Sequence, residues 1–115
     1  DKDVSADIIE KYKNAPYRAP MIVILVNSYK EHPKVPAIEQ KLSTATAAQN
    51  IMLALNAMKY SCIWRTGKLA FNKSVQANLN LEDHQEILGY LYIGTESGEK
   101  KKIPNLDIDD FVSYL

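Results

Sequence analysis

The sequence predicts an α+β fold in which a sheet is flanked by helices, and three observations support this class. Residues 21–26 form a continuous apolar run and residues 86–94 are apolar on both faces, as is typical of strands that are covered on both faces. Residues 60–65 are predicted to form a further strand between them. A long helix is predicted over residues 37–59 and a weaker one over residues 69–79. Strands separated by helices in this order indicate a mixed α and β architecture.

The length of the chain is compatible with a single unit. It has 115 residues, of which 46% are apolar, and residues 1–115 are therefore expected to form one portion with one core. A short helix capped by Ser5 is predicted to end at the proline-containing residues 15–20. The tail, residues 106–115, has enough apolar side chains for one or two turns docked on the rest of the molecule.

The predicted long helix is unusual because it is apolar on nearly every side. Its residues 45–58 contain four exceptions, which are Thr46, Gln49, Asn50 and Asn56. A helix of this kind is expected to be buried all round, either as a central core helix or at an oligomer interface. A chain of 115 residues has difficulty wrapping such a helix completely. The pattern therefore favours a partner chain.

Composition excludes several classes of function. Lysine and arginine total 14, as do aspartate and glutamate, so no bulk charge favours nucleic acid or an anionic membrane. The single Cys62 and the two histidines make a disulfide framework and a dedicated metal site improbable. There is no signal-like segment and no apolar run long enough for a membrane span. These features lead us to expect a cytoplasmic protein without nucleic-acid or membrane partners.

The end of the second predicted strand carries the most informative residues. Trp64, Arg65, Thr66 and Gly67 combine a flat aromatic ring, a guanidinium group, a hydroxyl group and a glycine. This combination suits a flat, anionic ligand such as a flavin nucleotide. In the alternative interpretation, Arg65 ends a strand and pairs with a carboxylate.

No acid–base or nucleophile motif is present, so no catalytic residue is predicted. This fits a flavin, which carries its own redox chemistry while the protein binds and orients it. The run Lys100–Lys102 is interpreted as solvated charge, with the alternative that it holds a phosphate group across an interface.

Four separated segments resemble the nitroreductase family, and in particular its small bacterial branch of NAD(P)H nitroreductases. They are residues 14–20 (NAPYRAP), 34–40 (KVPAIEQ), 63–67 (IWRTG) and 87–95 (ILGYLYIGT). The likeness runs from about residue 15 to the C-terminal end. Several matches in one order are more specific than any single match.

The resemblance implies a mixed sheet flanked by helices around a long buried central helix. It also implies an FMN-dependent enzyme that uses NAD(P)H to reduce nitro compounds or similar small-molecule acceptors by a ping-pong mechanism. Such an enzyme would be a homodimer with FMN at the interface. The implied FMN contacts are Trp64, Arg65, Thr66 and Gly67. The implied contacts of the nicotinamide nucleotide, carried over more weakly, are Ala54, Leu55, Asn56, Ala57, Met58 and Lys59.

The chain also departs from the family pattern. The family's N-terminal segment, with an Arg-Arg-Ser-type motif that binds the FMN phosphate, has no counterpart in the sequence. We therefore expect this chain to correspond to the C-terminal part of a nitroreductase. The alternative function is that of a non-catalytic fragment which retains the fold and acts as an assembly or binding element.

Overall fold

The computed structural model describes residues 5–99 and 102–115, and the predicted α+β class is confirmed. Each of the three predicted strands is present, and the first is two residues longer than expected. The elements of the described residues are α1 (Ala6–Asn14), η1 (Ala15–Arg18), β1 (Met21–Ser28), α2 (Ala37–Ala57), β2 (Ser61–Arg65), η2 (Lys68–Phe71), α3 (Lys73–Asn78), β3 (Gln85–Gly94) and η3 (Ile108–Asp110), where η denotes a 3₁₀-helix.

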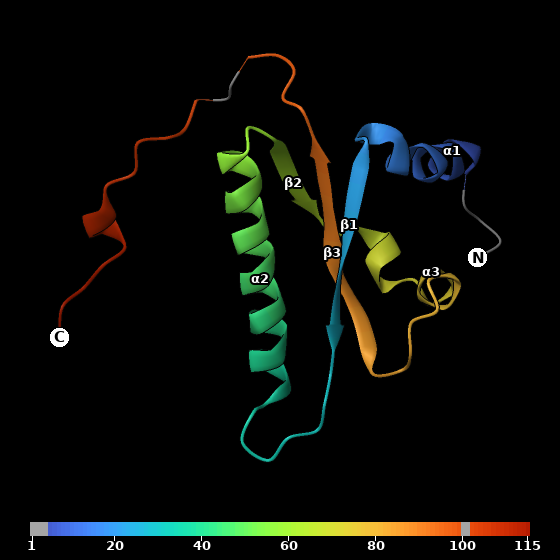
Figure 1. Cartoon of the computed structure of the whole chain (residues 1–115), viewed down its shortest axis with the longest axis horizontal. Coiled ribbons are helices and arrows are strands. Elements are labelled where there is room, and N and C mark those ends of the chain that lie inside the picture. The colour runs from blue at the N-terminus through green and yellow to red at the C-terminus, as the bar shows by residue number, and fades with distance from the viewer. Residues whose placement is uncertain (1–4, 100–101) are drawn as a thin grey trace.

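The three strands form one sheet in the order β1-β3-β2 (Figure 1). The last strand in sequence, β3, occupies the centre and runs antiparallel to both neighbours, so every pairing among the described strands is antiparallel. The helix α2 connects the two outer strands, which therefore point in the same direction with β3 inserted between them. This arrangement leaves an unpaired backbone edge on β1 and another on β2.

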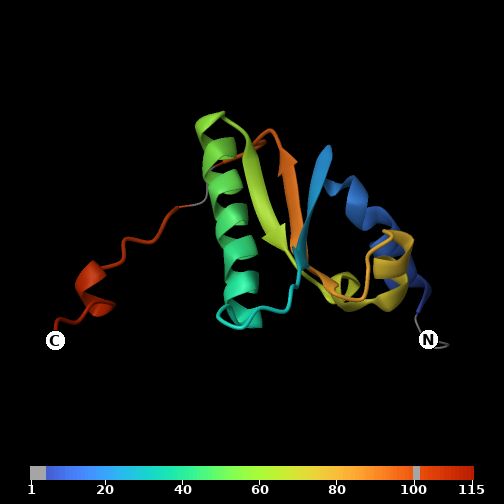
Figure 2. The same cartoon turned by 60° about the horizontal axis from the view of Figure 1, so that its bottom comes forward.

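Helices lie on both sides of this sheet, but they cover the two faces unequally. Figure 2 shows α2 along one face and α1 and α3 beyond the other. On the α2 side, Leu25, Leu91 and Ile93 pack with Ala48 of the helix into the buried cluster of the described residues. On the other side, alternate residues of β3 such as Tyr90 and Tyr92 are only half-buried. The expectation that the strands are covered on both faces is therefore met on one face and incompletely on the other.

The expectation that the long helix is buried all round is not met within this chain. Ala48 is 0% exposed and is the buried residue of α2, because it lies against the sheet. On the outward side, Leu42 is 57% exposed and Leu53 is 60% exposed. One sheet can cover only one side of a helix, so the apolar outward side has no cover from the described residues.

Despite its apolar character, α2 does not meet the requirements for crossing a membrane, and neither does any other helix in the described part of the chain.

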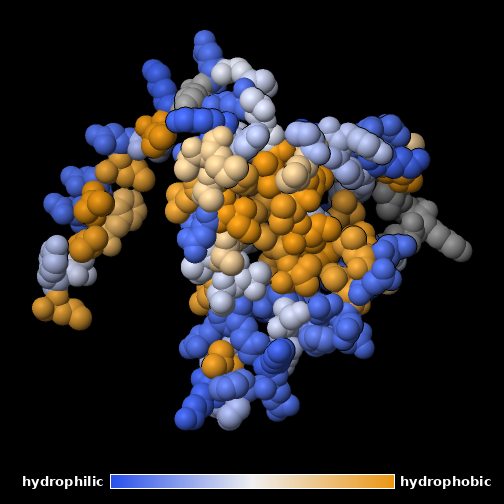
Figure 3. All heavy atoms as spheres, in the orientation of Figure 1, coloured by the Kyte–Doolittle hydropathy of each residue, from blue (hydrophilic) through white to orange (hydrophobic). Residues whose placement is uncertain are grey.

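The prediction of a docked tail is wrong. Residues 102–115 contain a single 3₁₀-turn and run away from the sheet and α2 (Figures 1 and 2). Phe111 is 72% exposed, and Leu106 and Ile108 are exposed as well. Figure 3 shows these apolar side chains along the tail, and a second apolar area where Figure 1 has β1. The sequence supplied apolar residues for docking, but it does not say on which molecule they dock.

The Trp64 indole of β2 makes a close contact with Gly89 of β3 on the α2 side of the sheet. The indole of Trp64 lies directly over the Cα of Gly89, where a Cβ atom would come within 2.8 Å of the indole Cδ1. A glycine in the middle of a strand usually marks such a close approach. The half-buried position of the Trp64 ring therefore depends on the absence of a side chain at residue 89.

Replacing this glycine should displace the indole. We expect Gly89→Ala to lower the free energy of unfolding by about 1–3 kcal/mol, the usual cost of overpacking a core. Urea denaturation followed by the fluorescence of Trp64 measures this. The matched control is Gly94→Ala in the same strand, whose Cβ would lie 3.1 Å from Pro20 Cδ. Equal losses in the two variants would contradict the role assigned to Gly89.

Candidate functional site

The strand β2 sends the residues of the predicted flavin-binding segment to opposite faces of the sheet. Trp64 is paired with Leu91 and packs against the core on the α2 side. Arg65 is paired with Tyr90, and its exposed side chain lies on the other side. Successive residues of a strand point to opposite faces, so these two side chains cannot line the same cavity. The structure thus brings together Arg65, Thr66 and Gly67 but separates them from the Trp64 ring.

Trp64 is nevertheless connected to the segment by hydrogen bonds. Its indole Nε1 donates to Thr66 Oγ1 at 3.2 Å, and Thr66 Oγ1 donates to the backbone oxygen of Leu88, also at 3.2 Å. The hydroxyl group accepts one bond and donates the other, and it does both through a single oxygen atom. This chain of bonds fixes the end of β2 against β3 and so positions the residues that follow.

Gly67 makes the turn that leaves β2. Its φ of 63° and ψ of 176° belong to a region that is accessible almost only to glycine. No heavy atom outside its immediate neighbours would lie within 4 Å of a Cβ at this position, so the requirement for glycine is conformational. The turn leads directly into η2 and brings Lys68 beside the end of β2.

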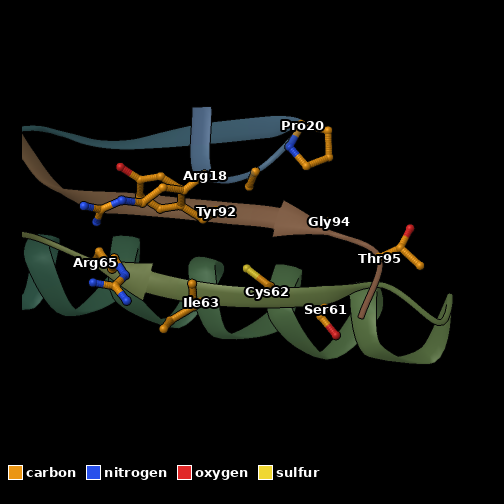
Figure 4. A pocket seen from close by; sticks show the side chains of 10 residues that line it. Arg18, Pro20, Ser61, Cys62, Ile63, Arg65, Tyr92, Gly94 and Thr95 are labelled. Carbon is orange, nitrogen blue, oxygen red and sulfur yellow. The ribbon is translucent and has the colours of Figure 1, made fainter. Parts of the chain in front are cut away.

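A trough runs over the face of the sheet that is opposite α2. It consists of two adjoining cavities of about 350 and 420 Å³ that share Arg18, Arg65 and Tyr92 in their walls. We call the two together the sheet-face trough. Figure 4 shows the first cavity, with the guanidinium groups of Arg18 and Arg65 at the end where β2 stops. Gly94 and Thr95 line the other end. The volumes are in the range of small-ligand sites.

The second cavity is strongly positive. Four cationic side chains line it, from α1, η1, β2 and η2, and no carboxylate does: Lys11, Arg18, Arg65 and Lys68. None of the four makes an ion pair with another residue in the described part of the chain. The alternative interpretation of Arg65, in which it pairs with a carboxylate, therefore has no support among these residues. The second cavity is suited to an anion.

Tyr90 lies in the wall between this cavity and an apolar cavity beneath α3. Its buried hydroxyl group has no hydrogen-bond partner. Burial, with a smaller contribution from Tyr92, raises the pKa of Tyr90, so its hydroxyl group stays protonated and able to donate.

Burial also raises the pKa of Cys62, which favours the unreactive thiol. No group of three or more metal-ligating side chains occurs in residues 5–99 and 102–115.

The segment predicted to contact the nicotinamide nucleotide lies at the end of α2. Its residues finish the helix, with backbone hydrogen bonds from Lys59 to Asn56 and from Tyr60 to Leu55. Lys59 has a φ of 67°, as expected at the turn of this type of helix end. The segment adjoins Ser61, at the far end of β2 from Arg65, about 13 Å along the strand. The first cavity reaches from Ser61 to Arg65 and is the described feature that spans this distance.

Sequence reasoning missed Lys11, Arg18, Lys68 and Tyr92 as members of the site. Arg18 lies within the segment that resembles the nitroreductases, but nothing in its local sequence indicates that it meets Arg65. The two arginines meet only because the folded sheet places η1, which precedes β1, near the end of β2. Of the run Lys100–Lys102, residues 100 and 101 lie outside the described residues, and Lys102 is exposed.

Comparison with known proteins identifies the family of this chain. The family model described as "Nitroreductase family" matches residues 3–95, so the chain belongs to the nitroreductase family. It is 34% identical over 110 residues to YdjA of Escherichia coli strain K12, named provisionally as an NAD(P)H nitroreductase. That alignment covers 93% of this chain and 59% of YdjA. A similarly named protein of Haemophilus influenzae is 28% identical, with 98% of this chain and 62% of the relative covered. The chain thus spans about three fifths of these relatives.

Solved structures confirm the fold. A nitroreductase-like family protein from Bacillus cereus superimposes with a TM-score of 0.74 and 18% identity, over 97% of this chain and 62% of that protein. The FMN and NADPH-dependent nitroreductase NfnB from Sphigopyxis sp. strain HMH gives a TM-score of 0.70 and 22% identity, over 100% of this chain and 52% of NfnB.

The hydroxyl group of Thr66 offers a direct test of the geometry at the end of β2. Thr66→Val keeps the shape but removes both hydrogen bonds, and should lower the free energy of unfolding by about 1–2 kcal/mol because the indole N–H loses its partner. Denaturation followed by fluorescence measures the change. Thr66→Ser retains the hydroxyl group and should stay close to wild type. If the serine variant were as unstable as the valine variant, the methyl group rather than the hydrogen bonds would matter.

Proposed function

We propose that this chain forms the flavin-facing part of a cytoplasmic, FMN-dependent oxidoreductase that uses NAD(P)H to reduce nitro compounds or similar acceptors. The observation that carries the proposal is the sheet-face trough, in which an arginine from the nitroreductase-like IWRTG segment lies in a positive, carboxylate-free wall. Membership of the nitroreductase family supports it. The FMN and NADPH dependence in the name of NfnB is consistent with it.

The residues of the trough fit the chemical character of FMN. The ligand combines a flat aromatic ring with a phosphate group, and the trough offers the ring of Tyr92 together with unpaired guanidinium groups. A bound FMN would supply the transfer of reducing equivalents from NAD(P)H to the acceptor, in a ping-pong scheme. The assignment of FMN to the trough therefore rests on the side chains of this chain itself.

The residues of the predicted segment then have different tasks. Arg65 would bind the ligand directly and stabilise negative charge on it. Thr66 and Gly67 would hold the backbone at the end of β2 in position. Trp64, on the other face, would act as a positioning residue through its hydrogen bond to Thr66. The nicotinamide nucleotide would reach toward the end of α2, where Met58 and Lys59 are exposed.

We also propose that the protein works as a homodimer, and the outward side of α2 is the main reason. Ile38, Leu42 and Leu53 are exposed and lie four and eleven residues apart, which places them on one stripe of the helix. A second copy would remove this apolar stripe from water. Ala48 does not belong to this surface, because it is buried against the sheet of its own chain.

An interface on α2 alone would leave the trough uncovered, since the two lie on opposite sides of the sheet. For FMN to lie at the interface, the partner must also reach the other face. The stretch from residue 95 to the C-terminal residue, which includes the tail, is long enough to do so. Residues 95–115 could span at most about 70 Å when extended. The exposed Leu106 and Phe111 supply apolar side chains for a contact of this kind.

The flavin assignment predicts a loss of affinity on removal of one guanidinium group. Arg65→Ala should weaken FMN binding by about 1–3 kcal/mol, because a hydrogen bond to a charged group is lost. Titration with FMN, followed through quenching of the single tryptophan, measures this, and Lys13→Ala is the charge-matched control. Unchanged affinity in Arg65→Ala would mean that Arg65 has no ligand role. Wild-type protein that neither binds flavin nor oxidises NAD(P)H on addition of FMN would favour the non-catalytic binding element.

The dimer assignment predicts that a charge on the outward stripe separates the subunits. Leu53→Lys should give the mass of one chain in light scattering, whereas wild type should give twice that mass, and the helical circular dichroism should persist. Tyr17→Lys makes the same kind of change at a residue that is 86% exposed on η1, and should remain dimeric. A dimeric Leu53→Lys protein would refute an interface on α2.

A further inference from the structure

We infer that Lys11, Arg18 and Lys68 join Arg65 in an anion subsite that takes the phosphate or diphosphate group of a nucleotide. The subsite occupies the second cavity of the sheet-face trough. The inference deepens the proposed function, because it names the part of a nucleotide that these residues recognise and adds three binding residues to the site.

The four side chains converge from separate parts of the chain. Lys11 comes from the last turn of α1, Arg18 from η1, Arg65 from the end of β2 and Lys68 from the start of η2. Nothing in the local sequence requires them to meet. The sheet brings them together because η1 precedes β1 on one side of β3 while η2 follows β2 on the other side. Convergence of this kind places positive charge in a concave surface instead of spreading it over the molecule.

The second cavity concentrates positive charge in a chain that is neutral as a whole. The whole chain has as many acidic as basic residues, 14 of each, yet no carboxylate lines this cavity. None of the four cations has an ion-pair partner among residues 5–99 and 102–115. Like charges that face one cavity repel each other, so an anion bound between them is stabilised by all of them at once. The two guanidinium groups can each offer a pair of parallel N–H donors, the geometry that phosphate oxygens accept best.

The shape of the trough indicates what the phosphate is attached to. The positive cavity continues past Tyr92 into a cavity whose walls are mainly uncharged, with Pro20, Ile63 and Gly94 among them (Figure 4). A ligand with a charged end and a flat, weakly polar body would match both halves. Under the proposed function, two such ligands share this chemistry, namely FMN through its phosphate and NAD(P)H through its diphosphate.

Pyrophosphate and riboflavin separate the two halves of the site experimentally. Pyrophosphate probes the anion subsite alone, and riboflavin, which lacks the phosphate, probes the ring half alone. Isothermal titration calorimetry at low salt is carried out on wild type, Arg18→Gln, Lys68→Gln, Arg18→Lys and Lys13→Gln. Lys13 is the matched control, because it lies two residues from Lys11 in the same helix and does not line the trough. Thermal unfolding followed by circular dichroism confirms that each variant is folded.

Pyrophosphate should bind wild type and Lys13→Gln equally and should bind Arg18→Gln and Lys68→Gln about tenfold more weakly, with partial recovery in Arg18→Lys. Absence of pyrophosphate binding in wild type, or an equal loss in Lys13→Gln, would overturn the inference. Riboflavin binding tests the proposed flavin site separately, since it should be the same in Lys68→Gln as in wild type, because Lys68 lines only the second cavity.

Competition then identifies the source of the phosphate. If FMN binds more tightly than riboflavin and this preference disappears in Arg18→Gln, the subsite holds the flavin's own phosphate. If FMN and riboflavin bind equally while NADPH displaces pyrophosphate, the subsite holds the diphosphate of the nicotinamide nucleotide. Pyrophosphate that neither nucleotide displaces would overturn the assignment to a nucleotide.

Discussion

In the antiparallel ladder between β2 and β3, Trp64 stands opposite Leu91 and Arg65 stands opposite Tyr90. This register decides which side chain enters the core and which enters the trough, because neighbouring residues of a strand point to opposite faces. The indole can lie over the sheet only because residue 89 of the central strand has no side chain. A shift of one residue would bury the guanidinium group against α2 and expose the indole. The candidate site therefore depends on how two strands are aligned, and not on its own residues alone.

The helix α2 follows from a different constraint. A three-stranded sheet offers one face to a helix, and Ala48 brings the helix backbone close to that face. The remaining apolar side chains, Leu42 and Leu53 among them, stay exposed because no other described residue covers them. The apolar side chains of the extended tail are also exposed, because they pack against no element in the described part of the chain. Two separate segments thus expose apolar side chains, and this exposure is the physical basis of the proposed homodimer.

Much of the fold could be predicted from the sequence because its signals are local. The apolar runs of β1 and β3 and the long pattern of α2 identify the elements to within a few residues. What the sequence could not supply is the direction in which apolar surfaces face. The composition of α2 indicates burial on every side, but the sheet in the described part of the chain covers only one side of the helix. The tail has apolar residues and yet does not fold back on its own sheet.

The candidate site was predictable in part for the same reason. The segment that ends in Gly67 is recognisable because its chemistry and its likeness to nitroreductases lie within a few residues. The local sequence does not predict that Lys11, Arg18 and Lys68 belong to the site, because they approach Arg65 only when the strands pair. Strand alternation does predict that Trp64 and Arg65 point to opposite faces of the sheet. The aromatic ring that lines the trough together with Arg65 is therefore that of Tyr92 and not that of Trp64.

The central claim is that the ligand lies on the face of the sheet opposite α2. The most direct measurement is an NMR titration of ¹⁵N-labelled protein with FMN, in which the amide signals that shift are mapped onto the fold. The largest shifts are expected around Arg18, the turn from Arg65 to Lys68, and Tyr92. Shifts confined to α2 and the core side of β2, with the signals of the trough unchanged, would contradict this claim.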